Sequence, residues 1–233
     1  METDKTAIER YRAVKAQILE AEQQAGREKG SVRLVGVTKT IDPQIINAVL
    51  DDGLTVIGEN RVQEFLDKRE SYHLSGVSVH FIGALQRNKV KYIIDKVDMI
   101  ESADSLALAE EISKRAVQCC RIMPVLIEIN IDKQQSKAGL LPEDAEGVIR
   151  EMAKLPGIAV KGLMCIPDPD KTPGSFARMQ QLFETLKQAD IPGVCMEELS
   201  MGMSGDYKQA IAYGATMVRV GRGIFGARFY PHP

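Results

Sequence analysis

A lysine at the end of an apolar run is the residue whose position most suggests chemistry. Lys39 closes the segment 33–39 (RLVGVTK), which is typical of a buried strand. An ammonium group is costly to bury without a partner, whereas a lysine that loses its proton there can attack an aldehyde and hold it as an imine. A lysine can also extend past the strand end into solvent. Position alone favours solvent exposure, so the chemical interpretation needs support from elsewhere in the chain.

That support comes from the glycine-rich segment 199–226 (LSMGMSGDYKQAIAYGATMVRVGRGIFG), which predicts a phosphate site. Glycines let backbone N–H groups approach an anion closely, and α/β barrels often bind phosphate with the loops after strands seven and eight. The glycines could instead only make tight turns. We prefer a phosphate site because both loops have the expected residues, which are Gly202, Ser204 and Gly205 in the first and Gly221, Arg222 and Gly223 in the second.

Four further polar residues lie within or just after expected strands. Arg219 either points inward, where a buried cation needs an acceptor such as a cofactor ring nitrogen, or outward as a surface arginine, and alternation does not decide between them. His80 is typical of a hydrogen-bonded core histidine. Asn60 and Asn130 could each orient a ligand or cap the helix that follows.

Eight short apolar runs alternate with helical stretches along the chain. The runs are 33–39, 55–60, 79–83, 98–102, 123–131, 159–167, 198–202 and 217–221. The helical stretches are 43–51, 61–71, 87–96, 105–119, 142–154, 174–189 and 205–213, after an amphipathic N-terminal helix at 3–25. This order predicts a parallel sheet, and eight strands close a (β/α)8 TIM-type barrel. An open doubly wound sheet is the alternative, but no G-x-G-x-x-G follows the first run.

Four residues mark expected helix starts. Pro43 and Pro142 suit the first turn of a helix, and Ser102 or Asp104 could cap the helix at 105–119. With no linker or shift in composition, the chain reads as one domain, 1–233.

Composition narrows the classes of function. The 233 residues are 44% hydrophobic and 27% charged, with a net charge of −2 and no basic stripe, so we expect no nucleic-acid partner. Four cysteines without a C-x-x-C pair predict neither a zinc site nor disulfides, and they fit the reducing cytoplasm. The charged N-terminus is unlike a signal peptide, and no apolar run is long enough for a membrane span. A monomer is the expected state.

Seven segments together resemble the pyridoxal phosphate (PLP) homeostasis proteins, also called proline-synthase-co-transcribed homologs. The segments are LVGVTKT (34–40), IGENRVQE (57–64), HFIGALQRNK (80–89), IEINIDKQQSKAGL (127–140), KGLMCIP (161–167), LSMGMSGD (199–206) and TMVRVGRGIFGAR (216–228). Two departures stand out: Val79 replaces a tryptophan that the family often has, and Arg222-Gly223 replaces its usual Thr-Ala, which changes the expected phosphate contacts.

The resemblance implies a PLP-binding barrel like the N-terminal domain of alanine racemase. The implied cofactor-binding residues are Lys39 as the Schiff-base lysine, Ser204, Gly221 and Arg222 at the phosphate, Arg219 facing the pyridine nitrogen, and Asn60 and His80 near the ring. It also implies a role in PLP and amino-acid homeostasis without efficient catalysis, with PLP-dependent apo-enzymes as conceivable partners.

Two enzymatic alternatives remain open. A PLP-dependent amino-acid racemase needs a proton donor on each face of the substrate carbon, but none of the six tyrosines lies at the C-terminal end of a strand. An imine-forming aldolase would also use a strand lysine and a phosphate loop. The sixth-strand lysine of such barrels corresponds here to Lys161, which lies near the wrong end of its run.

Overall fold

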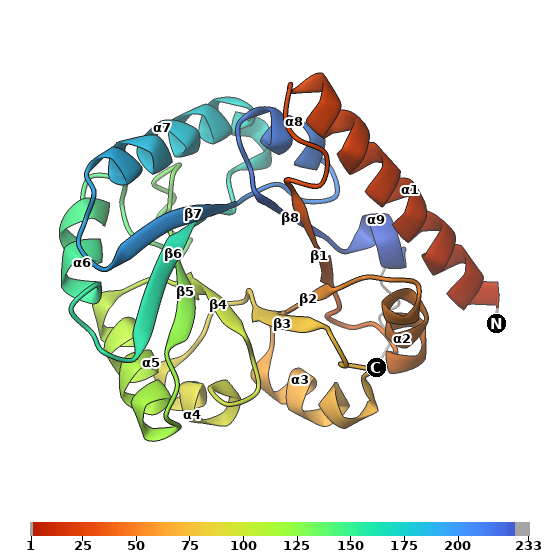
Figure 1. Cartoon of the computed structure of the whole chain (residues 1–233), viewed down its shortest axis with the longest axis horizontal. Coiled ribbons are helices and arrows are strands. Elements are labelled where there is room, and N and C mark those ends of the chain that lie inside the picture. The colour runs from red at the N-terminus through yellow and green to blue at the C-terminus, as the bar shows by residue number, and fades with distance from the viewer. Residues whose placement is uncertain (1, 227–233) are drawn as a thin grey trace.

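The computed structural model describes residues 2–226, in which eight parallel strands close into a barrel with helices outside it (Figure 1). The strands are β1 (Arg33–Val37), β2 (Val56–Glu59), β3 (Ser78–Phe81), β4 (Met99–Ala103), β5 (Met123–Glu128), β6 (Ile158–Met164), β7 (Val194–Ser200) and β8 (Met217–Val220). Each strand pairs with the next in sequence, and β8 returns to β1 with Val218 opposite Leu34. The predicted (β/α)8 barrel is confirmed.

Helices alternate with the strands as expected. They are α1 (Glu2–Gln24), α2 (Pro43–Asp51), α3 (Val62–Lys68), α4 (Val90–Ile93), α5 (Leu106–Gln118), α6 (Ala145–Met152), α7 (Gly174–Gln188), α8 (Tyr207–Ala212) and α9 (Arg222–Phe225), with 3-10 turns η1 (Arg69–Ser71), η2 (Arg87–Lys89) and η3 (Pro169–Lys171). The extra helix α1 runs along the outside of the barrel and packs against α2, α8 and α9 (Figure 1). In this part of the chain no helix combines the length and apolar character that a membrane span requires.

The helix starts are partly as predicted. Pro43 begins α2, as expected, but α5 is capped by neither Ser102 nor Asp104. Ser105 is the residue with extended backbone before α5, and its hydroxyl accepts the N–H of Leu108 at 3.3 Å. The Ser102 hydroxyl is not available because it donates to the carbonyl of Gly83.

Several element boundaries were wrong, among them the ends of β5 and β6, which were each predicted three residues too late. Helix α6 begins at Ala145 rather than at Pro142, because residues 142–144 form a turn, in which the N–H of Asp144 donates to the carbonyl of Leu141 and the N–H of Ala145 to that of Pro142. Strand β7 begins at Val194, four residues before the predicted start. Exposed polar residues, including Glu197, interrupt the apolar pattern of its first half.

The barrel interior is divided into an apolar layer and a polar layer. The apolar layer is a cluster separate from the main core and consists of Val35, Val56, Met99, Leu126, Met164 and Met217. Because side chains alternate along a strand, the inward positions two residues further on are Val37, Gly58, Glu101, Glu128, Ile166 and Arg219. The polar members of this second set lie toward the C-terminal ends of the strands, where barrel active sites are found.

Candidate cofactor site

A cavity of about 240 Å³ opens at the C-terminal ends of the strands. Its walls are Val37 and Lys39 after β1, Pro169 after β6, residues 203–206 after β7, and Arg219, Gly221 and Arg222 at the end of β8. The structure therefore brings five of the seven predicted residues together, namely Lys39, Ser204, Arg219, Gly221 and Arg222. Asn60 and His80 are not among the residues that line it.

Lys39 faces the cavity because of its register on β1. Val35 belongs to the apolar interior and Val37 lines the cavity, so Lys39 continues the inward-facing row. Thr38 points the opposite way, and its hydroxyl donates to the buried carboxyl of Glu59 at 2.7 Å. The Lys39 side chain is half-buried in this wall, which favours the chemical interpretation of this lysine over simple extension into solvent.

The loops after β7 and β8 meet at one end of the cavity and offer hydrogen-bond donors. The Ser204 hydroxyl accepts the N–H of Gly223 at 3.2 Å, so it links the two loops. Within residues 2–226, the backbone N–H groups of Ser204 and Arg222 donate to no acceptor. Asp206 also lines this end, but its carboxylate accepts the N–H of Met203 at 2.6 Å. A hydroxyl, a guanidinium and open N–H groups suit an anion.

Close packing explains why a glycine stands at this end of the cavity. Gly202 has a φ of +92°, in the region that favours glycine, and a Cβ there would lie 2.6 Å from the Cβ of Ala210. The chain can therefore turn sharply from β7 into the loop only with glycine at this position.

Arg219 points inward and is 3% exposed. Its Nη1 donates to the Ser200 hydroxyl at 2.6 Å, and its Nη2 donates to the carbonyl of Cys165 at 2.8 Å. Ser200 in turn donates to Glu101 Oε2 at 2.6 Å, and Glu101 Oε1 lies 2.7 Å from Nδ1 of His80. The sequence left open whether Arg219 points inward or outward, and this buried hydrogen-bonded network shows that it points inward.

Within this His80–Glu101–Ser200–Arg219 network, Glu101 is kept ionised by its partners. Burial would raise the pKa of Glu101, but the hydrogen bond and charge of His80, together with the charge of Arg219 at 4.0 Å, hold the pKa below its ordinary value. Glu101 is therefore a carboxylate beside the guanidinium. His80 is 2% exposed and hydrogen-bonded in the core, which confirms the interpretation based on its residue type.

Neither asparagine caps a helix. Arg61, not Asn60, is the residue that precedes α3. The Oδ1 atom of Asn60 is buried and accepts no hydrogen bond in the described part of the chain. Such an atom is uncommon in folded proteins, but Asn60 does not line the cavity. Asn130 instead organises its own loop, where its amide bonds the backbone of Gln134 and the carbonyl of Lys137.

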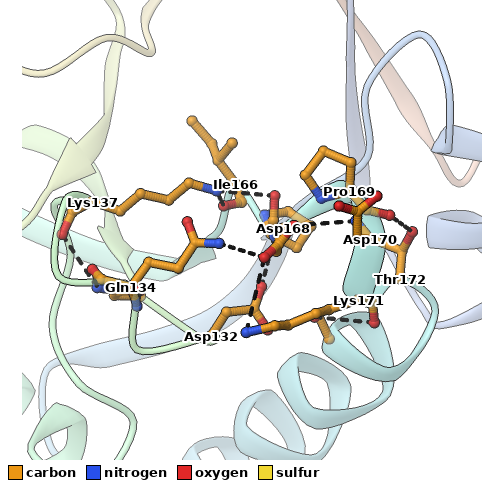
Figure 2. Close-up of polar contacts among 12 residues, drawn as sticks. Asp132, Gln134, Lys137, Ile166, Asp168, Pro169, Asp170, Lys171 and Thr172 are labelled. Carbon is orange, nitrogen blue, oxygen red and sulfur yellow. Dashed lines mark hydrogen bonds and ion pairs between the residues drawn. The ribbon is translucent and has the colours of Figure 1, made fainter.

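The loop after β5 and the loop after β6 contact each other, as Figure 2 shows. Lys137, from the loop after β5, donates through Nζ to the carbonyls of Ile166 and Pro167 at 3.1 and 3.2 Å. The amide of Gln134 donates to Asp168 at 2.6 Å. These contacts hold the loop after β6, which carries Pro169 into the cavity wall.

Sequence reasoning missed three interior polar residues: Glu101, Ser200 and Glu128. The signal was present, since Glu101 and Glu128 each follow an interior apolar residue, Met99 or Leu126, by two positions. Burial, reinforced by the charge of Asp104, raises the pKa of Glu128 to about 7. A carboxyl group with a pKa near neutral thus belongs to the polar layer of the barrel, although it does not line the cavity.

Comparisons with known proteins place the chain in a family. Residues 10–229 match the family described as the alanine racemase N-terminal domain. The pyridoxal phosphate homeostasis protein of Aquifex aeolicus is 41% identical over 228 residues, which are 96% of this chain and 99% of the relative. The protein of the same name from Deinococcus radiodurans is 44% identical over 216 residues, 91% and 98% of the two chains.

Solved structures agree with the sequence comparison. PipY of Synechococcus elongatus, solved with PLP bound, is 32% identical with a TM-score of 0.78 over 90% of this chain and 100% of that one. A protein of unknown function from Bifidobacterium adolescentis is 38% identical, with a TM-score of 0.90 and 96% of both chains covered. An alanine racemase of Clostridium difficile, 16% identical with a TM-score of 0.75, matches 97% of this chain with 58% of its own and shares the fold. By sequence and by fold, the chain belongs to the pyridoxal phosphate homeostasis protein family, whose barrel is of the alanine racemase N-terminal type.

Proposed function

We propose that the protein binds PLP as a Schiff base on Lys39 and serves PLP and amino-acid homeostasis without efficient turnover, with residues 1–233 acting as one PLP-binding domain. The observation that carries the proposal is that one cavity contains both a strand-end lysine and the donors of the β7 and β8 loops. The relatives named for PLP homeostasis and the PLP-bound PipY structure support the same ligand.

The residues present fit this cofactor. PLP supplies an aldehyde that condenses with an amine, and a ring that withdraws electrons from the resulting adduct. Lys39 provides the amine, and Ser204, Gly221 and Arg222 provide the phosphate-binding end of the cavity. Asn60 and His80, which do not line the cavity, would lie behind its wall and not in contact with the phosphate-binding end.

The environment of Arg219 argues against efficient catalysis. A fixed cation in the cavity wall disfavours protonation of a nearby pyridine nitrogen, which weakens the ring as an electron sink. None of the five tyrosines in residues 2–226 lines the cavity, so a tyrosine base on a second face is not provided there. Tyr230 lies outside the described residues.

Absorbance spectroscopy tests the proposal. Protein saturated with PLP is expected to absorb at about 420 nm, and Lys39→Ala is expected to lose this band. Lys137→Ala is the matched control, because Lys137 is a half-buried lysine near the same mouth with its amine bonded to two carbonyls. An unchanged band in Lys39→Ala, or its loss in Lys137→Ala alone, would reject Lys39 as the Schiff-base residue.

Weak amino-acid racemisation is a second candidate, favoured by one observation. The carboxyl of Glu128, with a pKa of about 7, could exchange a proton near the mouth at neutral pH. Incubation of the PLP-loaded protein with L-alanine in D2O, followed by NMR, measures this exchange. Deuterium at the α-carbon that disappears in Glu128→Gln would support a racemase; no exchange would support cofactor holding alone.

An aldolase has less support, since Lys161 of β6 pairs with Glu197 at 3.4 Å and does not line the cavity. We also infer a cytoplasmic monomer whose partners are PLP and, at most, PLP-dependent apo-enzymes. Gel filtration with light scattering tests the oligomeric state, and transfer of PLP to an added apo-enzyme tests the partner.

A further inference from the structure

The segment that carries Lys39 is held in an unusual backbone conformation. Thr40, the next residue, has a φ of +65°. A β-branched residue rarely adopts the left-handed region, and such outliers concentrate at functional sites. The conformation therefore needs contacts that maintain it, and it sets the direction in which the chain leaves Lys39.

Glu64 on α3 supplies the contact to Thr40. Its Oε1 accepts the backbone N–H of Thr40 and also the ammonium of Lys68 at 2.7 Å. Glu64 is the third residue of α3, where a glutamate commonly bonds the N–H of the residue that caps its own helix. Here it reaches instead to the end of another strand.

Lys68 and Glu59 form further hydrogen bonds to the residues on either side of Lys39. The Lys68 ammonium donates to the carbonyl of Ile41 at 2.8 Å. On the other side of Lys39, Thr38 donates its hydroxyl to Glu59. The residues before and after Lys39 are thus bonded to β2 and α3, while Lys39 alone among residues 38–41 lines the cavity.

The Glu64–Lys68 pair is suited to work at neutral pH. Both side chains are mostly buried, at 17% and 20% exposure. Burial would raise the pKa of Glu64, but the bonds from Lys68 and from the Thr40 N–H outweigh it and hold the pKa below its ordinary value. The carboxylate is therefore ionised and bonded unless the solution is acidic.

We propose that Glu64 is a positioning residue that, through Thr40 and Lys68, directs the Lys39 amine into the cofactor cavity. None of these three residues lines the cavity, so Glu64 acts on the ligand only through the backbone around Lys39. This inference deepens the proposed function, since it assigns a support to the Schiff-base lysine.

The test is competitive amine labelling of the PLP-free protein, with mass spectrometry of each lysine peptide, alongside PLP titration. In Glu64→Ala we expect the Lys39 amine to be labelled roughly threefold faster or more, because it reaches solvent. We also expect PLP to bind about tenfold more weakly, because a displaced amine is no longer held in the geometry that favours its reaction with the aldehyde. Glu64→Gln, whose amide oxygen can still accept the Thr40 N–H, should recover part of both. Glu70→Ala is the matched control, since Glu70 is 86% exposed and, within residues 2–226, pairs with Arg69 alone.

Labelling of Lys137 distinguishes positioning from general loosening. The proposal is overturned if Lys39 labels at the wild-type rate in Glu64→Ala, or if Lys137 accelerates equally. Should Glu64→Ala not fold, Lys68→Met takes its place, because it removes the bond to Ile41, and unchanged Lys39 labelling there overturns the proposal too. Failure of the proposed function would appear separately, as absence of a PLP adduct on wild-type Lys39.

Discussion

Removing the buried cation Arg219 should destabilise the barrel through the partner that it leaves behind. Arg219 and Glu101 are 3% and 0% exposed, and their charged atoms lie 4.0 Å apart. At an effective dielectric constant of about 20, two unit charges at that distance attract by about 4 kcal/mol. Loss of one partner of a buried pair costs about 3 to 5 kcal/mol, because the other charge stays buried. We expect Arg219→Met to lower the free energy of unfolding by this amount.

A double-mutant cycle isolates the cause. Arg219→Met leaves the Glu101 carboxylate buried without its cationic partner, and Glu101→Gln removes that charge. The double variant should therefore lose about 1 to 3 kcal/mol less stability than the sum of the two single-variant losses. The measurement is urea unfolding of PLP-free protein, followed by circular dichroism. Arg150→Met is the control, because Arg150 pairs with Glu146 on an exposed helix face, where such pairs contribute about 0.5 kcal/mol or less. Additive losses, within about 0.5 kcal/mol, would refute the coupling between Arg219 and Glu101.

Two other predictions concern Glu128 and Ser204. Since the folded-state pKa of Glu128 lies near 7, above its ordinary value of 4.5, the folded protein holds the proton more tightly than the unfolded chain, and stability falls as pH rises between these values. Glu128→Gln should therefore stabilise the protein at pH 8, by up to about 3 kcal/mol, and have little effect at pH 4. Thermal unfolding measures this, and an equal change in stability at both pH values would contradict the prediction. Ser204→Ala removes the hydroxyl that joins the loops after β7 and β8. It should weaken PLP binding about tenfold, measured by fluorescence titration, and unchanged affinity would contradict a phosphate site at these loops.

Much of the fold could be predicted because apolar strand runs and helical crossovers alternate clearly along the chain. Lys39 and Ser204 could be predicted because they lie at strand ends, where the barrel gathers functional residues. The direction of Arg219 could not, since all four residues of β8 are buried and both faces look alike in sequence. The partners of Arg219 come from β4, β6 and β7, and only the closed barrel brings them together.

The support of Lys39 was likewise hidden from sequence reasoning. Glu64 and Lys68 are spaced as an ordinary i, i+4 pair on a helix, which usually indicates a solvated surface contact. Only the structure shows that both also bond the backbone just after Lys39.

The most direct test of the account is borohydride reduction of the PLP-loaded protein, followed by peptide mass spectrometry. The account predicts one phosphopyridoxyl adduct, on the peptide that contains Lys39, and its absence from Lys39→Ala. An adduct on Lys137 or another lysine of the wild-type protein, with Lys39 unmodified, would contradict the central claim.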